Sequence, residues 1–214
     1  MIAPLGITAE AHVGAIGPVE AGEMEKQPPR WANDACKEMR CRDPTAAEAM
    51  VEIVESHRMS LNSIGSRVDL TIKGTPLGLG EPWFDGLEPA LARALMAIPA
   101  ARAVEFGRGV NAGEMRGSQH NDKWGEGMKL DEGADGALGG MASGAPIHVR
   151  ITFKPPSGIS LPQETFNQIS GMMEELSIKG RHDPVIAPRA RPVVEAVARL
   201  VIADLGIQGG YIDG

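Results

Sequence analysis

The chain has 214 residues, of which 43% are hydrophobic and 23% charged, a balance that is ordinary for a globular protein with a buried core. Its formal net charge of -7, with no basic stripe, argues against a nucleic-acid-binding protein. No apolar run approaches the roughly 20 residues of a membrane span, and no basic-then-apolar leader follows Met1, so we expect a cytoplasmic protein.

The N-terminal region begins with one strand pattern. Residues 7–13 alternate between apolar and polar side chains, which predicts a half-buried strand with His12 on its exposed, polar face. Residues 14–34 are rich in Gly, Pro and Glu and predict a loop. Cys36 and Cys41 have no second Cys/His pair nearby, so reduced structural thiols are favoured over a zinc site.

A helix start follows at Asp43. A capping residue, Pro44 in the first turn and a capping box formed by Thr45 and Glu48 are typical of a helix N-terminus. Apolar residues then recur at helical spacing, and the helix is expected to end near Ser60.

The next segment reads as strand, helix and strand. Residues 68–73 alternate and predict a strand with one solvated face. Asp85 is expected to cap a second helix, which Pro99 ends. Residues 104–106 indicate a further short strand.

Periodicity disappears across residues 107–146, where glycines accumulate. A loop of this length is usually either functional or disordered. Its polar cluster contains Arg116, His120, Asn121 and Asp122. A metal site at His120 and Asp122 is conceivable, but two ligands two residues apart are weak grounds for one.

Residues 147–153 form the clearest strand pattern, with His148 on the polar face. Lys154, Ser157 and Gly158 follow directly. An amine, a hydroxyl and a residue that lets the backbone approach closely suit a phosphate.

Residues 179–192 concentrate positive charge. Between Lys179 and Arg199 there are five cations and two anions. Prolines 184, 188 and 192 fix φ and remove backbone donors, which predicts an extended loop that holds Arg181, His182 and Asp183 together. Arginine suits carboxylates and phosphates, and a His beside an Asp can move protons near neutral pH. The alternative is a solvated basic loop before a helix.

Residues 193–205 are apolar on nearly every side and predict a helix buried in the middle of the fold. The order of strands and helices favours one domain over residues 1–214, of α+β class, with antiparallel sheet packed on a helical layer.

Several segments together resemble chorismate synthases. The strongest is Gly-Arg-His-Asp-Pro at 180–184, followed by Pro-Arg-Ala-x-Pro-Val-Val-Glu-Ala at 188–196. Five further segments occur in the family's order: Gly-Leu-Gly-Glu-Pro-Trp-Phe-Asp (78–85), Ala-Leu-Met-Ala-Ile-Pro-Ala (94–100), Met-Arg-Gly-Ser-Gln-His-Asn-Asp (115–122), Leu-Gly-Gly (138–140) and Phe-Lys-Pro-Pro-Ser (153–157). Arg191 departs from the family's usual apolar residue.

The resemblance covers the C-terminal part of such an enzyme. The family's Phe-Gly-Glu-Ser-His-Gly segment, its Arg-Pro-Gly-His segment and its Arg/Gly/Ser-rich flavin loop do not occur among the 214 residues. The two catalytic histidines of the family therefore have no counterparts here. The resemblance implies part of a sandwich in which helices lie between antiparallel sheets.

The resemblance also implies an activity. Chorismate synthase is a carbon–oxygen lyase that converts 5-enolpyruvylshikimate 3-phosphate to chorismate and phosphate. It does so by a 1,4-elimination with reduced FMN, as the last step of the shikimate pathway to aromatic amino acids. The resemblance further implies a role for NADP and assembly as a homotetramer. A partner carrying the missing N-terminal portion is expected, and the alternative is a non-catalytic truncated remnant.

The site residues follow from the same resemblance. Asp183 matches the family's catalytic aspartate, which assists deprotonation at flavin N5. The residues expected to bind FMN or the substrate anion are Pro99, Ala100, Gly139, Lys154, Pro155, Pro156, Ser157, Gly158 and Arg181. The segment 107–146 is expected to be a flexible loop over the active site.

Overall fold

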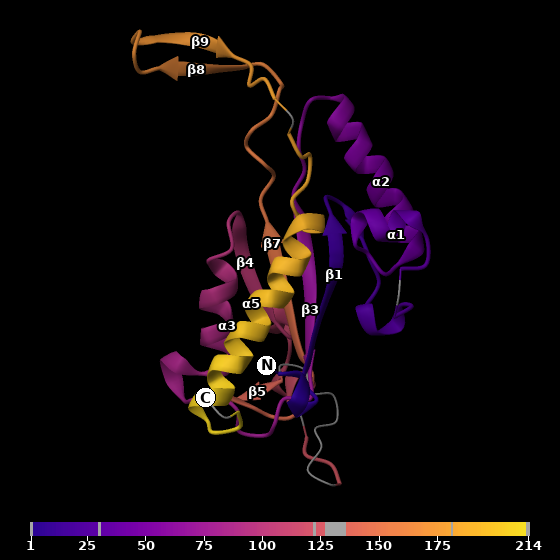
Figure 1. Cartoon of the computed structure of the whole chain (residues 1–214), viewed down its shortest axis with the longest axis vertical. Coiled ribbons are helices and arrows are strands. Elements are labelled where there is room, and N and C mark those ends of the chain that lie inside the picture. The colour runs from indigo at the N-terminus through magenta and orange to yellow at the C-terminus, as the bar shows by residue number, and fades with distance from the viewer. Residues whose placement is uncertain (1, 30, 122, 127–135, 181, 213–214) are drawn as a thin grey trace. The chain divides into compact units, whose positions relative to one another are not determined.

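The computed structural model describes residues 2–29, 31–121, 123–126, 136–180 and 182–212 (Figure 1). The chain divides into two compact units. Unit 1 comprises Met1–His12, Val68–Thr152 and Arg189–Gly214, and unit 2 comprises Val13–Arg67 and Phe153–Pro188.

Strands and helices are interspersed along the chain, and the five strands β5 to β9 follow one another before α5. The strands are β1 (Thr8–Ile16), β2 (Val19–Glu20), β3 (Ser66–Lys73), β4 (Ala101–Phe106), β5 (Ala137–Leu138), β6 (Met141–Ala142), β7 (Ile147–Phe153), β8 (Gln163–Asn167) and β9 (Met172–Leu176). The α-helices are α1 (Asp34–Met39), α2 (Pro44–Met59), α3 (Leu87–Met96), α4 (Gly117–His120) and α5 (Ala187–Gln208). Short 3-10 helices are η1 (Ala3–Leu5), η2 (Met24–Lys26), η3 (Trp83–Asp85) and η4 (Gly109–Glu114).

A five-stranded sheet with the order β2-β1-β3-β7-β4 is the main sheet. β1 and β2 pair antiparallel, with Ala15 opposite Glu20 and Ile16 opposite Val19. Two small antiparallel sheets, β5-β6 and β8-β9, complete the strands. The predicted α+β class with antiparallel pairing is confirmed.

β7 confirms the clearest strand pattern of the sequence. Its residues alternate between buried and half-buried from Ile147 to Phe153, as the 2-residue period of a strand requires. His148 is half-buried, and its Nδ1 lies 3.2 Å from Thr71 Oγ1 of β3. The histidine of the polar face is thus held by the neighbouring strand.

His12 of β1 is fully buried, so its predicted exposure is wrong. The strand alternates between exposed and buried only from Thr8 to Ala11, and every residue from there to Ile16 is buried. Val13 N donates to Arg40 O at 2.9 Å, so the chain leaving α1 lies against the strand at this point. A polar residue in an alternating pattern predicts solvent only where nothing packs on that face.

Helices α1 and α2 form a capped pair in unit 2. Asp43 Oδ1 accepts from Ala46 N at 3.1 Å and Pro44 is the first helical residue, so the predicted start of α2 is confirmed, as is its end at Ser60. The expected capping box is absent from this start, because Asp43 is itself the cap. Glu48 instead accepts from Asn33 Nδ2 at 3.0 Å.

Asn33 caps α1, a helix that the sequence pattern did not predict; its side chain accepts from Cys36 N at 2.8 Å. Cys36 and Cys41 are buried, and no disulfide joins them.

The second helix starts one residue later than expected. Gly86, not Asp85, is the N-cap of α3, because Asp85 lies in η3 and its carboxylate is 3.9 Å from Arg93. A Cβ added to Gly86 would lie 2.8 Å from Glu81 O and 2.9 Å from the Gly140 Cα. The close approach of these backbone segments therefore requires glycine at this cap.

The glycine-rich stretch 107–146 contains short elements rather than none. η4, α4 and the β5-β6 hairpin lie within it, and Gly80 bridges Met141 of β6. Asp122 and residues 127–135 of this stretch lie outside the described residues.

Helix α5 begins earlier than the prolines predict. The expected loop over 179–192 ends at Ile186, and Pro188 and Pro192 are helical. Pro188 is the second residue of the helix, where the backbone N–H has no intrahelical partner. Pro192 lies one turn further on, so its missing donor removes one helical hydrogen bond.

One face of α5 is exposed and apolar, which corrects the expectation of a fully buried helix. Val194, Ala198 and Ile202 are fully buried. Val193, Leu200 and Ile207, on another side, expose 44%, 62% and 40% of their surface. We call these three residues the outer stripe of α5.

Side chains of α5 bind the backbone of β1. Glu195 Oε1 accepts from Ala11 N at 2.8 Å, and Arg191 Nε donates to Ala11 O at 2.8 Å. Arg191 also donates to Glu195, and Arg199 donates to Ala9 O at 2.7 Å. We call these hydrogen bonds between α5 and β1 the clasp. Arg191, which departs from the family's pattern, is one of its donors. Charged side chains thus satisfy backbone groups of β1 that a neighbouring strand would otherwise pair.

Replacing Glu195 with Ala is expected to lower the free energy of unfolding by about 3 kcal/mol, because it leaves a part-buried guanidinium and a buried amide without their shared acceptor. Urea unfolding followed by circular dichroism measures this change. The matched control is Asp204→Ala on the same helix, where the carboxylate is exposed and accepts from Gln208 Nε2 at 2.8 Å. This control is expected to stay within about 0.5 kcal/mol of the parent. Equal effects of both substitutions would contradict a stabilising clasp.

The β8-β9 hairpin was not predicted from the sequence. Neither Gln-Glu-Thr-Phe-Asn nor Met-Met-Glu-Glu-Leu has the alternation of a half-buried strand, and the structure gives the reason. Every residue of the two strands is exposed except Asn167, which is half-buried. A strand without a buried face carries no hydrophobic period to detect.

Candidate functional site

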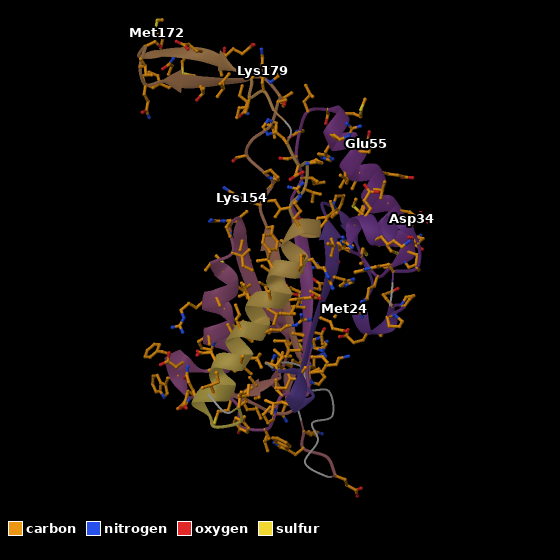
Figure 2. All side chains as sticks on the ribbon, viewed as in Figure 1. Met24, Asp34, Glu55, Lys154, Met172 and Lys179 are labelled. Carbon is orange, nitrogen blue, oxygen red and sulfur yellow. The ribbon has the colours of Figure 1, made fainter. Side chains whose placement is uncertain are left out.

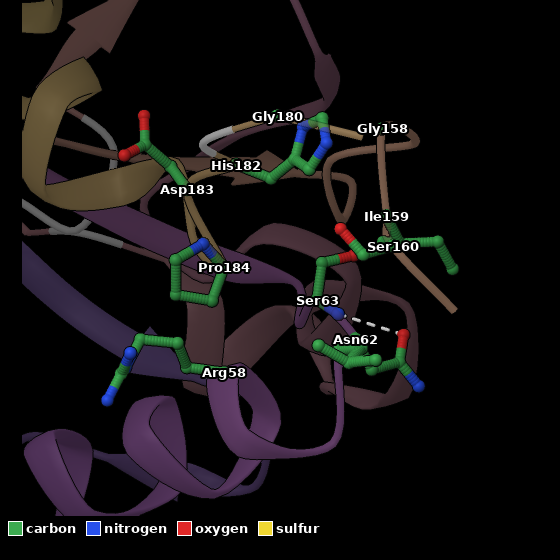
Figure 3. A pocket seen from close by; sticks show the side chains of 11 residues that line it. Arg58, Asn62, Ser63, Gly158, Ile159, Ser160, Gly180, His182, Asp183 and Pro184 are labelled. Atoms are coloured by element: carbon green, nitrogen blue, oxygen red, sulfur yellow. Dashed lines mark hydrogen bonds between the residues drawn. The ribbon is translucent and has the colours of Figure 1, made fainter. Parts of the chain in front are cut away.

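A cleft of about 360 Å³ lies within unit 2. Three segments line it: the end of α2 with the turn after it, the chain beyond β7, and the chain before α5 (Figure 3). The lining residues are Arg58, Leu61, Asn62, Ser63, Gly158, Ile159, Ser160, Gly180, His182, Asp183 and Pro184.

Hydrogen bonds hold the three segments together. Ser63 Oγ donates to Pro156 O at 2.6 Å, and Leu161 N donates to Leu61 O at 3.2 Å. Ile64 N donates to Pro184 O at 2.9 Å. The turn after α2 is therefore the common support of both other segments, which places Ser63 at the centre of the cleft's framework.

His182 and Asp183 are both half-buried. The His182 ring faces Gly158 and Gly180, and the Asp183 carboxylate points away from that ring (Figure 3). A Cβ added to Gly158 would lie 3.3 Å from His182 Nδ1, so glycine leaves room for the imidazole. Nε2 of the same ring lies 3.3 Å from Ile178 O. The predicted grouping of His182 with Asp183 in one loop is found, and Arg181 lies outside the described residues.

The cation at the cleft's rim already has a carboxylate partner. Arg58 Nε and Nη2 donate to Glu55 at 2.7 and 2.5 Å. This hydrogen-bonded pair holds the pKa of Glu55 below its ordinary value and the pKa of Arg58 above its own. A ligand anion would have to compete with Glu55 for this guanidinium.

The segment expected to form a phosphate cradle reaches the cleft at one end. Gly158 lines the cleft, whereas Lys154, Pro155 and Ser157 are exposed and Pro156 contributes its carbonyl to Ser63. The Lys154 side chain extends from the chain just beyond β7 (Figure 2). The structure thus brings Gly158 and Asp183 together in one cleft.

Pro99 and Ala100 belong to unit 1 and form a strained turn. Ala101 N donates to Ile98 O at 3.0 Å, and Ala100 has a φ of 70°. This is the geometry of a type II turn with proline in its favoured position, but with alanine where glycine is usual. Backbone strain of this kind clusters at functional sites.

Gly139 also belongs to unit 1 and lies in the turn between β5 and β6. Its φ is 62°, and no atom lies within 4 Å of an added Cβ. Gly140 O accepts from Leu87 N at 2.7 Å, which ties this turn to the start of α3. Gly139 therefore presents open backbone on a fixed turn.

Sequence reasoning missed Arg58, Ser63 and Ser160 as lining residues. The role of Ser63 follows from its hydrogen bond to Pro156 O, 93 positions further along the chain. Among the residues that the structure describes, no group of three His, Cys, Asp or Glu side chains could hold a metal ion. In the same described part of the chain, no helix is long and apolar enough to cross a membrane.

Comparison with a solved structure identifies the fold. A protein described as "Crystal Structure of Chorismate Synthase" matches with a TM-score of 0.71 and 23% sequence identity, over 97% of this chain and 59% of that chain. The family model described as chorismate synthase matches residues 1–207. The chain belongs to the chorismate synthase family.

Curated relatives are longer than this chain. The chorismate synthase of Methanopyrus kandleri is 40% identical over 215 aligned positions, which cover 98% of this chain and 55% of the relative. That of Aeropyrum pernix is 42% identical over 210 positions, covering 96% of this chain and 55% of the relative. The chain thus spans little more than half the length of the curated relatives it matches.

Proposed function

We propose that this chain supplies the C-terminal part of a chorismate synthase, a lyase that converts 5-enolpyruvylshikimate 3-phosphate to chorismate and phosphate with reduced FMN. One observation carries the proposal: Asp183 of the Gly-Arg-His-Asp-Pro segment lines a cleft that Gly158 also lines. The family match over residues 1–207 supports the same assignment. A cytoplasmic location suits a biosynthetic enzyme of this family.

The residues that would hold FMN fit such a group. A flavin site needs backbone that can lie close to the flavin ring. It also needs hydrogen-bond donors for the flavin phosphate. Gly139 has open space where a side chain would stand, Ala100 adopts a strained turn, and the Lys154 amine is exposed. In this proposal the backbone of Pro99, Ala100 and Gly139 contacts the flavin. Residues 154–158 and Arg181 bind its phosphate or the substrate anion. When bound, reduced FMN supplies an electron-rich ring that is not consumed overall.

In this proposal, three neighbouring residues divide the remaining work. With FMN bound, Asp183 would take the proton from flavin N5, because a carboxylate can act as a general base. His182, the preceding residue, packs against Gly158 and lines the same cleft. Arg181 offers a planar fork for a carboxylate or phosphate. These roles need a second set of proton-transfer groups at the leaving phosphate, which the family places on two histidines absent from this sequence.

A partner that carries the missing histidines is therefore part of the proposal. The outer stripe of α5 supports it: Val193, Leu200 and Ile207 leave an apolar surface that further polypeptide would cover. The matched relatives have the length to supply such polypeptide. In this proposal, this chain and the partner together form one complete unit, and several such units assemble as a homo-oligomer.

The test is complementation. The chain is co-expressed with the part of the Methanopyrus kandleri relative that it does not match, and the purified complex is assayed for chorismate with reduced FMN. We expect turnover from the complex and its loss with Asp183→Asn. A stable complex that binds FMN but never forms chorismate would favour the alternative, a non-catalytic remnant. Failure to form any complex would contradict the proposed partner.

A further inference from the structure

The turn after α2 has a closed hydrogen-bonding pattern. Leu61 has a φ of 58°, and its N–H donates to Arg58 O at 3.2 Å. Asn62 N donates to His57 O at 2.9 Å. Two such bonds around a left-handed residue form the Schellman motif that ends many helices. Asn62 Oδ1 also accepts from Ser63 N at 2.8 Å (Figure 3). The backbone that leads to Ser63 is therefore held in one conformation.

One of the segments that this turn contacts is stiff. We call residues 154–158 the proline segment, because Pro155 and Pro156 follow one another in it. Proline fixes its own φ and restricts the residue before it to extended backbone, so Lys154 to Pro156 move as one unit. Neither proline has an N–H with which to anchor the segment. A single bond to one of its carbonyls therefore also orients the Lys154 amine and the Ser157 hydroxyl.

Ser63 makes that bond. Its Oγ donates to Pro156 O at 2.6 Å. Both residues are half-buried, so the bond is partly shielded from water. The backbone next to Ser63 packs along the same segment, because a Cβ added to Gly65 would lie 3.4 Å from Phe153 O and 3.6 Å from Pro155 Cδ. The Ser63 hydroxyl thus fixes the proline segment against the turn.

Ile64, the next residue, holds the segment that carries Asp183. Its N–H donates to Pro184 O at 2.9 Å, and Pro184 directly follows Asp183. Ser63 and Ile64 belong to unit 2, as do the residues that they bind. Two successive residues therefore set how far the proline segment lies from Asp183, one through a side chain and the other through its backbone.

We propose that Ser63 is a positioning residue through which the proline segment binds a phosphate monoester, a role that rests on the chorismate synthase function proposed above. FMN and 5-enolpyruvylshikimate 3-phosphate both carry such a group. The Ser63 hydroxyl is bound to Pro156 and acts through it: it holds the proline segment in place before the phosphate arrives, which lowers the ordering cost of binding. Asp183 is held through Ile64 instead, so loss of the hydroxyl leaves that carboxylate in place.

The test compares flavins with and without a phosphate. FMN and riboflavin, which differ in the phosphate alone, are titrated by calorimetry into the complemented complex that carries the parent chain or Ser63→Ala. The dissociation constant of FMN is expected to rise about fivefold, the usual effect of one neutral hydrogen bond, whereas that of riboflavin stays at the parent value. The substrate is titrated in the same way with oxidised FMN bound. A rise confined to the substrate would assign the proline segment to the substrate phosphate rather than to the flavin phosphate.

Ser60→Ala is the matched control. The Ser60 hydroxyl also donates to a backbone carbonyl, that of His57 at 3.1 Å, but the residue is exposed and this bond stays within the end of α2. Ser60→Ala is expected to bind both flavins and the substrate like the parent.

Two results would overturn the positioning role of Ser63. In one, Ser63→Ala binds FMN and the substrate like the parent. In the other, Ser63→Ala loses FMN and riboflavin equally, so that the hydroxyl supports the cleft without regard to phosphate. A parent complex that binds neither flavin nor substrate contradicts the proposed function itself, and the role of Ser63 falls with it.

Discussion

The isolated 214-residue chain is expected to form no measurable chorismate, even with reduced FMN and 5-enolpyruvylshikimate 3-phosphate supplied. The physical reason is the absence of both histidine segments of the family and of its Arg/Gly/Ser-rich loop. Loss of a proton-transfer group typically costs about 10²–10⁴-fold in rate, and here two are missing together. The measurement is an anaerobic assay of chorismate and phosphate with the purified chain.

The control for this experiment is flavin binding by the same preparation. If the chain binds FMN but does not turn over, its cofactor residues work and the missing chemistry lies elsewhere. Turnover at a rate typical of enzymes, on the order of 1–10³ s⁻¹, would contradict the division of roles between this chain and a partner.

Arg181→Ala is expected to weaken FMN or substrate binding in the complemented complex by about 2–5 kcal/mol, the usual penalty for breaking a buried charge-assisted pair. Arg181 lies outside the described residues, so this expectation rests on its position between Gly180 and His182, which both line the cleft. Arg181→Lys should recover only part of the affinity, because a point charge cannot reproduce the planar fork. Titration of FMN and substrate into the complex measures both effects.

Asp183→Asn should behave differently from Arg181→Ala. The substitution keeps the side-chain shape but removes the group that accepts a proton, so turnover should fall while FMN affinity stays close to the parent value. Asp85→Asn, at an exposed carboxylate of unit 1, is the control. If Arg181→Ala binds both ligands like the parent, the segment 180–184 is scaffolding and the assignment of the site is wrong.

Local patterns predicted the elements that bury one face or carry a clear cap. β7 was predicted with the same first and last residues as observed, because its side chains alternate between buried and half-buried along the whole strand. The start of α2 followed from Asp43 and Pro44. The prediction that His12 is exposed was wrong, because a polar side chain in a strand pattern does not reveal that another segment covers that face. The hairpin β8-β9 was missed because it has no buried face at all.

The candidate site was predictable only where it coincides with a motif. Asp183 and Gly158 could be proposed from their segments, and the structure places both at one cleft. Arg58 and Ser63 could not, because the end of α2 reaches the cleft only through contacts between distant segments: Ser63 donates to Pro156 O and Ile64 donates to Pro184 O. Such contacts leave no mark in local composition. They arise from how distant segments pack.

The clasp between α5 and β1 limits where a further strand can join the main sheet. Ala9 O, Ala11 N and Ala11 O are occupied by Arg199, Glu195 and Arg191, and β2 pairs with β1 at Ala15 and Ile16. The main sheet is thereby closed to a new strand along this edge, which also removes a site of edge-to-edge aggregation. A further strand therefore cannot pair with β1 at Ala9 and Ala11, because side chains of α5 already bind these backbone groups.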